Sequence, residues 1–245
     1  DIPWVVGYSG GKDSTAVLQL VWLALSCMSS EELTKDVHVI STDTMVENPI
    51  VASWVSASLD RLHAAAEEEG LPIYAHKLMP KTVDSYWVNL IGKGYPAPRP
   101  KFRWCTERLK IKPANEFINA VVKTHGEAIV VLGTRKSESA ARAAVMNRLE
   151  KESIRESLRP HTMLQNSYVF SPIEDWSNED VWVFLSGVEN PWGHSNFDLV
   201  DLYRGATADR ECPLVVEEGT PSCGDSRFGC WVCTLVEQDK SMQAM

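Results

Sequence analysis

Six consecutive residues near the start of the chain have the composition of a phosphate-binding loop. Ser9-Gly10-Gly11-Lys12-Asp13-Ser14 follows a short apolar run and precedes a long apolar segment. The two glycines permit a tight turn, several amide N–H groups can then converge at a helix start, and Lys12 supplies a cation. The loop is not the common P-loop, which has Ser or Thr after the lysine, because Asp13 stands there. A plain glycine turn with an exposed lysine is the alternative, and the flanking strand and helix patterns favour an anion cradle.

A second group of reactive residues lies near the end of the chain. It comprises Cys212, Cys223, Cys230 and Cys233. The C-x-x-C pair lets two thiolates reach one metal from a tight turn, and two further cysteines complete four-coordination. Four sulfur ligands suit zinc and a four-iron four-sulfur cluster equally, and buried or redox-active thiols are the alternative. With no secretion signal in the chain, disulfides are disfavoured, and we expect a reducing, cytoplasmic setting.

The other two cysteines stand apart. Cys105 lies in a basic loop between Arg103 and Arg108, whose positive charges favour the reactive thiolate. Packing of this thiol beside Trp104 is the alternative. Cys27 falls within the apolar segment after the glycine loop, and we expect it in the core.

The elements that must position these residues alternate along the chain. Apolar, β-branched runs predict strands at 4–8, 37–41, 73–76, 128–132 and 168–171. Periodic apolar segments predict helices at 14–28, 49–69, 85–91, 113–123, 138–150 and 178–186. This alternation predicts an α/β fold, a parallel sheet with helices on both faces and ligands at the carboxyl ends of its strands.

The regular alternation is lost from residue 191 onward. We therefore expect an α/β domain over 1–190 and an irregular cysteine-rich segment over 191–245 that is organised around its ligands. The longest apolar stretch, residues 16–28, falls short of the roughly 20 residues that a membrane span needs, so no membrane association is expected.

The glycine loop resembles the pyrophosphate loop of the PP-loop ATP pyrophosphatases, a family with an adenine nucleotide alpha hydrolase-like fold that includes sulfate-assimilation reductases and tRNA thiolases. The resemblance implies that Ser9 to Ser14 hold the β- and γ-phosphates of ATP while an acceptor oxygen attacks the α-phosphate and releases pyrophosphate. Lys12 would neutralise charge, and Asp13 or Asp43 would help to place Mg²⁺.

Two further segments fit the same family. Thr42-Asp43-Thr44 follows the second expected strand, and residues 133–139 follow the fourth and resemble the Gly-x-Arg-x-x-Glu-Ser motif of the reductases. Gly133 and Arg135 would then join the nucleotide site, with Arg135 placed to meet a phosphate. Helix capping is the alternative for Asp43 and Glu138.

Nearly the whole chain resembles the sulfurtransferases of bacterial DNA phosphorothioation systems. The likeness is carried by Phe102-Arg103-Trp104-Cys105-Thr106, Ser171-Pro172-Ile173-Glu174-Asp175-Trp176 and the cysteine-rich residues 211–234. It implies a four-iron four-sulfur cluster on Cys212, Cys223, Cys230 and Cys233. It also implies a DNA substrate, a cysteine desulfurase as sulfur donor and further subunits of a modification complex.

The implied reaction replaces a non-bridging oxygen of a DNA backbone phosphate by sulfur. Adenylylation turns that oxygen into part of a good leaving group, AMP, with Lys12, Asp13 and Arg135 acting on ATP and Cys105 relaying sulfur as a persulfide. The competing enzymes are a phosphoadenylyl- or adenylyl-sulfate reductase, whose adjacent cysteine pair and C-terminal catalytic cysteine are absent here, and a tRNA thiolase. A nucleotide-binding regulatory module is a fourth possibility, which the intact Lys12 and Asp13 disfavour.

Charge is distributed unevenly over the 245 residues. The chain has 24 basic and 33 acidic residues, a formal charge of -9, which excludes a protein that coats nucleic acid. Between Gly92 and Lys112, however, seven basic residues face a single acid, Glu107. We expect a small, salt-sensitive DNA contact there, made by Lys101, Arg103 and Arg108. Tyr95, Phe102 and Trp104 in the same loop would stack on bases.

Overall fold

The computed structural model describes residues 2–99, 102–150, 157–205 and 230–234, and its centre is a six-stranded sheet in the order β3-β2-β1-β4-β6-β5. Five strands are parallel: β1 (Trp4–Gly7), β2 (Val37–Thr42), β3 (Ile73–Leu78), β4 (Ala128–Val131) and β6 (Ser167–Phe170). The short β5 (Arg159–Pro160) runs antiparallel to β6 at one edge. The predicted α/β class is confirmed, with one antiparallel strand that the sequence pattern did not show.

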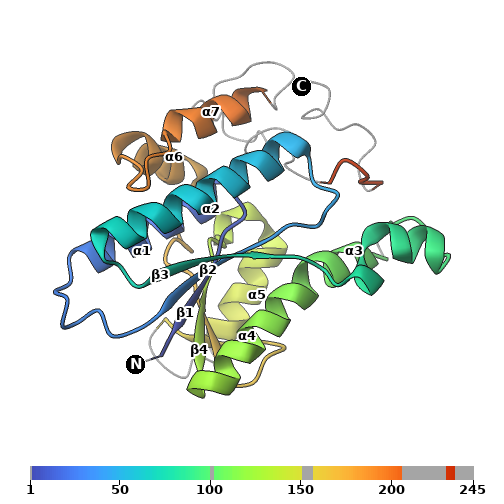
Figure 1. Cartoon of the computed structure of the whole chain (residues 1–245), viewed down its shortest axis with the longest axis horizontal. Helices are drawn as coiled ribbons and strands as arrows, with labels where there is room; N and C mark the ends of the chain where they lie inside the picture. The colour runs from blue at the N-terminus through green and yellow to red at the C-terminus, as the bar shows by residue number, and fades with distance from the viewer. Residues whose placement is uncertain (1, 100–101, 151–156, 206–229, 235–245) are drawn as a thin grey trace.

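Helices cover both faces of this sheet (Figure 1). One face carries α1 (Lys12–Ser26), α2 (Pro49–Glu69), α6 (Asn178–Gly187) and α7 (Asn196–Gly205), and the other carries α4 (Lys112–His125) and α5 (Ala140–Glu150). The larger core lies under the first group, and a smaller core around Ile118 and Val130 lies under α4. β4 is buried along its whole length, which is why its sequence is entirely apolar.

Short helical turns connect β3 to α4. They are the 3₁₀ turn η1 (Thr82–Asp84), the π-helical turns η2 (Val88–Gly92) and η3 (Glu107–Ile111), and the single α-helical turn α3 (Trp104–Thr106). Most of the predicted helix at 85–91 is therefore π-helical. A further 3₁₀ turn, η4 (Lys136–Glu138), precedes α5.

Two glycines allow the glycine loop to approach its neighbours. Gly10 has a φ of 74°, and a Cβ there would come within 2.5 Å of the Val55 side chain. A Cβ on Gly133 would lie 2.8 Å from the backbone carbonyl of Asp13. Because both contacts exclude a side chain, the start of α1 can pack directly on α2 and on the end of β4.

The structure corrects two expectations. Residues 196–205 form the helix α7, within the segment 191–245 that was expected to be irregular. Asn196 on α7 is buried and accepts a 2.7 Å hydrogen bond from Gln19 of α1. Cys27 is exposed at the end of α1 and does not belong to the core, because the apolar stripe of that helix ends with Leu25. Among the helices in the described part of the chain, none combines the length and hydropathy needed to cross a membrane.

Candidate nucleotide and cysteine site

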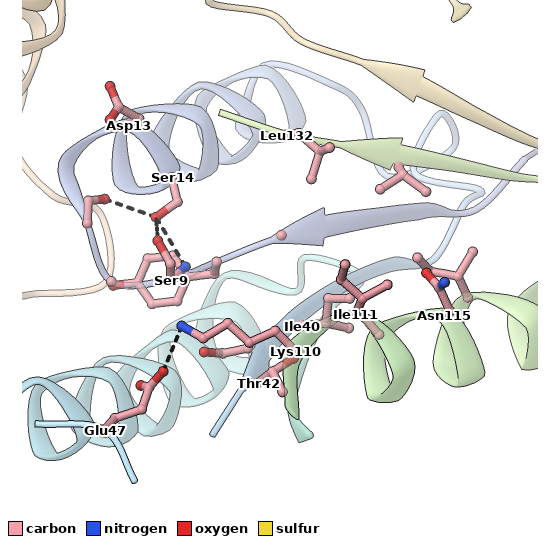
Figure 2. A pocket seen from close by; sticks show the side chains of 18 of the residues that line it. Ser9, Asp13, Ser14, Ile40, Thr42, Glu47, Lys110, Ile111, Asn115 and Leu132 are labelled. Carbon is pink, nitrogen blue, oxygen red and sulfur yellow. Dashed lines mark hydrogen bonds and ion pairs between the residues drawn. The ribbon is translucent and has the colours of Figure 1, made fainter. Parts of the chain in front are cut away.

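The glycine loop is held in shape by its own hydroxyl groups. Ser14 Oγ accepts a 3.2 Å hydrogen bond from the Ser9 N–H and donates to the Gly11 carbonyl at 2.9 Å, and Thr15 Oγ1 donates to the same carbonyl at 2.9 Å. Figure 2 shows the Ser9 and Ser14 side chains turned toward one another at the edge of a cavity. The loop is thus formed before any ligand binds, as an anion cradle requires.

The cavity beside this loop has a volume of about 850 Å³, and all six loop residues line it. Its opposite part is lined by apolar side chains of β2, β4, η3 and α4 and of the residue after β4, namely Ile40, Ile111, Ala114, Ile118, Val130 and Leu132 (Figure 2). A phosphate-binding end joined to an apolar end suits a nucleotide, whose polyphosphate is charged and whose base is flat and largely apolar.

Lys12, Asp13 and Arg135 form a chain of alternating charge next to the loop. Lys12 Nζ lies 3.0 Å from Asp13 Oδ2, and Arg135 Nε lies 2.7 Å from Asp13 Oδ1. Arg135 is only 2% exposed, and its Nη1 also donates to Ser137 Oγ at 2.8 Å. The structure therefore places Arg135 behind Asp13, where it orients that carboxylate, and not on the cavity wall among the phosphate-facing residues.

The carboxylates expected to place Mg²⁺ are already paired. Asp43 Oδ2 lies 3.0 Å from Lys77 Nζ, and its Oδ1 accepts from the Met45 N–H at 2.8 Å. With both oxygens of Asp13 also engaged, neither carboxylate offers a metal a free oxygen in this arrangement. Paired in this way, the two carboxylates do not fit a protein-held Mg²⁺.

Tyr203 of α7 also contacts the glycine loop, although nothing in the sequence pattern indicated this contact. Its hydroxyl accepts a 3.2 Å hydrogen bond from the Lys12 backbone N–H, and its ring lies 5.6 Å from Lys12 Nζ. An amide at the start of α1 is one of the donors that an anion cradle uses. Tyr203 thus occupies one donor of the cradle from a helix more than 190 residues away in sequence.

Lys110 and Glu47 connect the cavity to the cysteines. Both line the cavity, and Lys110 Nζ lies 3.0 Å from Glu47 Oε1 (Figure 2). Burial lowers the pKa of Lys110, but the charge of Glu47 and its hydrogen bond outweigh burial and raise it, with a further contribution from Cys230 and Cys105. The backbone of Glu47 forms an antiparallel bridge with Cys230. A cation of the cavity is therefore a direct neighbour of the cysteine turn.

The turn 230–234 is fixed to the domain by several contacts. The Cys233 N–H donates to the Cys230 carbonyl at 3.0 Å, which closes the C-x-x-C turn, and the Trp231 N–H donates to the Val46 carbonyl at 3.0 Å. Cys230 Sγ lies 3.5 Å from Thr44 Oγ1. Burial raises the pKa of the Cys230 thiol, while the Thr44 hydroxyl and the Lys110 charge oppose that rise.

Cys105 lies beside this turn. It packs with Cys230 on the small apolar cluster of Val46, Tyr86, Trp104 and Leu109, and the two thiols are near enough that Cys105 raises the pKa of Cys230. The sequence suggested two separate cysteine features, and the fold brings them to one place. Cys212 and Cys223, the other two predicted ligands, lie outside the described residues.

Two of the four predicted ligands of a cluster or a zinc ion, Cys230 and Cys233, lie within the described residues. Within the described ranges, no three His, Cys, Asp or Glu side chains gather closely enough to hold a metal ion. Cys230 and Cys233 are nevertheless both half-buried and close one turn, and Cys230 also packs against an apolar cluster, as suits thiolate ligands. These two residues fit the predicted site.

The basic loop is only partly available for DNA. Arg108 Nη1 lies 2.8 Å from Asp84 Oδ1, and its Nη2 donates to the Tyr95 hydroxyl at 2.9 Å, so its guanidinium holds the loop together. Arg103 is exposed and finds no partner among the residues described. Lys101 lies outside the described residues. Trp104 is buried and stacks on Tyr86, so it is not a surface for bases as the sequence suggested.

Comparison with known proteins gives a family match over almost the whole chain. A model of the phosphoadenosine phosphosulfate reductase domain matches residues 3–235. An uncharacterized protein of Methanocaldococcus jannaschii is 27% identical over 204 residues, which cover 82% of this chain and 35% of the relative. The chain thus spans about a third of the length of that relative.

Two solved structures are similar at low identity. One is a phosphoadenylyl-sulfate reductase from Candida auris in a phosphate complex, with 16% identity, a TM-score of 0.43, and coverage of 76% of this chain and 73% of that one. The other is the U34-tRNA thiolase NcsA of Methanococcus maripaludis with its four-iron four-sulfur cluster, with 15% identity, a TM-score of 0.46, and coverage of 89% and 62%.

Proposed function

The chain belongs to the phosphoadenosine phosphosulfate reductase domain family, and from that membership we propose that it is an ATP-dependent sulfurtransferase that replaces a non-bridging oxygen of a DNA backbone phosphate by sulfur. The support comes from the preformed glycine loop and its nucleotide-sized cavity, together with the likeness of residues 102–106 and 211–234 to DNA phosphorothioation sulfurtransferases.

One observation carries the proposal. Lys110 and Glu47 both line the proposed ATP cavity and pair with each other, and the backbone of Glu47 pairs with Cys230, which packs with Cys105 on one apolar cluster. An enzyme that activates a phosphate with ATP and then attacks it with sulfur needs the nucleotide and a reactive thiol at one reaction centre. A nucleotide hydrolase or a regulatory module has no use for that juxtaposition.

In the first step the loop binds the β- and γ-phosphates of ATP. Backbone amides at the start of α1 and the Lys12 ammonium neutralise the charge that develops on the leaving pyrophosphate. Asp13, oriented by Arg135, fixes the Lys12 ammonium beside the loop. An oxygen of the DNA phosphate attacks the α-phosphorus, the bond to the β-phosphate oxygen breaks, and pyrophosphate leaves.

In the second step sulfur displaces AMP. The terminal sulfur of a persulfide on Cys105 attacks the activated DNA phosphorus, and the bond to AMP breaks. A second thiolate then attacks the Cys105 sulfur, which releases the phosphorothioate and leaves a disulfide that a dithiol reductant restores. A cysteine desulfurase would load Cys105, and further subunits would select the DNA site.

Cys230 and Cys233, with Cys212 and Cys223, would hold the iron-sulfur cluster. When bound, such a cluster would supply a centre that stores sulfur or electrons beside Cys105. The residues of this chain that orient the reaction remain Lys12, Cys105 and Lys110.

Reduction of an adenylyl sulfate is the second candidate, because the matched family takes its name from that activity. The position before Cys105 speaks against it. Those reductases carry two adjacent cysteines, whereas the residue before Cys105 is Trp104, which is buried and whose Nε1 donates to the Pro96 carbonyl at 3.0 Å. No second thiol is available at that point of the chain.

The test supplies ATP, a desulfurase with cysteine, a dithiol reductant and one of three acceptors: DNA, tRNA or adenylyl sulfate. We expect pyrophosphate release that depends on DNA and a dinucleotide phosphorothioate in the nuclease digest by mass spectrometry. Lys12→Met should abolish both, and Cys105→Ser should abolish only the sulfur. Sulfite formation, or sulfur found in tRNA and absent from DNA, would refute the DNA assignment.

A further inference from the structure

Two tryptophans form an exposed pair at the cysteine turn. Trp87 and Trp231 are 44% and 51% exposed, and their ring centroids lie 5.9 Å apart at an interplanar angle of 45°. Trp231 lies between the two cysteines of the C-x-x-C turn, and Trp87 immediately precedes η2. Ile91, one turn further along, is 74% exposed. Large apolar side chains gathered in this way on a surface mark a binding site more often than chance exposure.

The pair is rigidly supported. The Trp231 N–H is bonded to Val46, the Tyr86 hydroxyl donates to the Val232 carbonyl at 3.4 Å, and Thr234 Oγ1 donates to the Pro98 carbonyl at 2.5 Å. The Trp87 ring meets the edge of the buried Tyr86 ring at 5.1 Å. Both indoles are therefore presented by ordered backbone, which lowers the entropy lost when a flat ligand packs on them. In Figure 1 the turn is drawn in red, above the green segment that carries the label α3.

The charge next to the pair is positive. The described residues of the basic loop comprise six cations, Lys93, Arg99, Arg103, Arg108, Lys110 and Lys112, against one acid, Glu107. Asp84 and Glu47 pair with Arg108, Lys112 and Lys110, which still leaves an excess of three positive charges. Arg99 and Arg103 are exposed, and the described part of the chain gives their guanidinium groups no partner.

We propose that Trp87 and Trp231 form a stacking surface for an unpaired base of the nucleic acid substrate, with Arg99 and Arg103 holding the adjoining phosphates. Aromatic faces beside unpaired cations are the combination that binds single strands. In a duplex each base face is covered by its neighbours, so the surface takes a nucleotide that is single-stranded or flipped out of the helix. This inference rests on the proposed function and names the form of DNA that reaches the cysteines.

The experiment measures fluorescence anisotropy of a labelled single strand and of its duplex. Trp87→Ala and Trp231→Ala should each weaken single-strand binding about tenfold, since stacking contributes roughly 1–3 kcal/mol per base. Trp231→Tyr should retain most of the affinity. Phe197→Ala removes a 65% exposed aromatic ring on α7 and is the matched control, with no change expected.

An abasic strand separates stacking from general destabilisation. Removing one base from the strand should weaken binding to the wild type about as much as Trp231→Ala does, and should cost nothing further in that variant. Arg103→Gln should lower the slope of log affinity against log salt by about 1, whereas the tryptophan variants should leave the slope unchanged.

The outcomes are distinct for the two proposals. Equal binding of intact and abasic strands, or unchanged affinity in both tryptophan variants, overturns the stacking surface while sulfur insertion into DNA can still stand. Tryptophan-dependent binding without sulfur insertion overturns the proposed reaction and leaves the surface. A wild type that binds neither strand form overturns both, and selective loss of a protein partner in the variants, with DNA binding intact, assigns the surface to that partner.

Discussion

At the residue scale, the site consists of charges that already have partners. Lys12 is matched by Asp13, and Lys110 by Glu47, before any ligand arrives. A bound polyphosphate must compete for these ammonium groups with carboxylates of this chain. Its affinity therefore depends on the difference between the interactions that each ammonium group makes with the phosphate and those that it gives up with the carboxylate.

The exchange at Lys110 can be tested by removing each partner. Lys110→Met should weaken ATP binding about tenfold, because a charge-assisted hydrogen bond contributes roughly 1.5–3 kcal/mol. Glu47→Gln frees the ammonium and should strengthen ATP binding a few-fold. Calorimetric titration with ATP checks both, and equal weakening in the two variants would show that the ion pair acts only as a structural support.

His161 provides a pH-dependent contribution at the rim of the same cavity. Its Nδ1 accepts from the Met163 and Leu164 N–H groups at 3.1 and 3.2 Å, so the proton of the neutral ring is on Nε2. Burial lowers the pKa of His161. As pH falls, the unfolded chain, in which His has a pKa near 6.5, therefore takes up a proton before the folded protein does. The stability that the neutral His161 contributes is lost progressively below about pH 6.5.

The measurement compares wild type with His161→Gln between pH 7.5 and 5.5. The unfolding temperature of the wild type should fall more steeply than that of the variant over this range, because glutamine does not titrate. The other histidines are present in both proteins, so their contribution to the pH dependence cancels in the comparison. Parallel curves would show that His161 titrates alike in the folded and unfolded chain.

At the scale of elements, the irregular connection from β3 to α4 is organised by Asp84. This carboxylate of η1 is buried and pairs with Arg108 of η3 at 2.8 Å and with Lys112 of α4 at 2.5 Å. Three separate elements are thereby joined at one point. The ion pairs of Asp84 fix η3 and the start of α4 relative to η1.

Asp84→Asn should therefore destabilise the protein at neutral pH. Breaking a buried pair costs about 3–5 kcal/mol, and partly exposed partners reduce this to roughly 2–3 kcal/mol. The hydrogen bond from Lys112 lowers the pKa of Asp84, burial opposes this, and Arg108 adds to the lowering. A depressed pKa contributes stability above about pH 4 that is lost as pH falls through the folded value.

Urea unfolding at pH 7 and at pH 3 checks this. The difference in unfolding free energy between wild type and Asp84→Asn should be present at pH 7 and should shrink at pH 3, where the carboxylate begins to protonate. Glu116→Gln, which removes an exposed ion pair with Lys81, is the matched control and should change stability by less than about 1 kcal/mol. A difference that is the same at both pH values would rule out the charge of Asp84 as its cause.

At the scale of the whole molecule, α7 completes the proposed nucleotide site. Tyr203 of α7 reaches the phosphate loop, and its ring meets Trp182 of α6 edge-on at 5.2 Å. Asn196 anchors the other end of α7 to α1 and to the Leu185 carbonyl. The helix that leads toward the cysteine-rich residues is therefore in contact with the phosphate cradle.

Tyr203→Phe tests that contact. Removing the hydroxyl should lower the unfolding free energy of the ligand-free protein by about 1 kcal/mol, the value of one neutral hydrogen bond. Because the hydroxyl no longer competes with the ligand for the Lys12 N–H, pyrophosphate should bind up to about fivefold more tightly. Weaker pyrophosphate binding in the variant would mean that the hydroxyl instead helps to hold the anion.

Much of the fold was predictable because its signals are local. The apolar runs at β1 and β4, the Asn48-Pro49 start of α2 and the Gly70 end of that helix depend on neighbouring residues alone. The π-helical turn η3 and the helix α7 were not predicted, since η3 is held by the ion pair of Arg108 with Asp84 and α7 by the buried Asn196. Their stabilising partners are distant in sequence.

The sequence by itself determined the phosphate loop, the C-x-x-C turn and the alternation that places them on an α/β sheet, because each depends on residues only a few positions apart. Only the tertiary structure decided what each site residue touches. It buried Arg135 behind Asp13, 122 positions away, brought Tyr203 to Lys12 across 191 positions and joined Cys105 to the turn of Cys230. Such contacts come from the packing of whole elements, for which a single sequence carries no local signal.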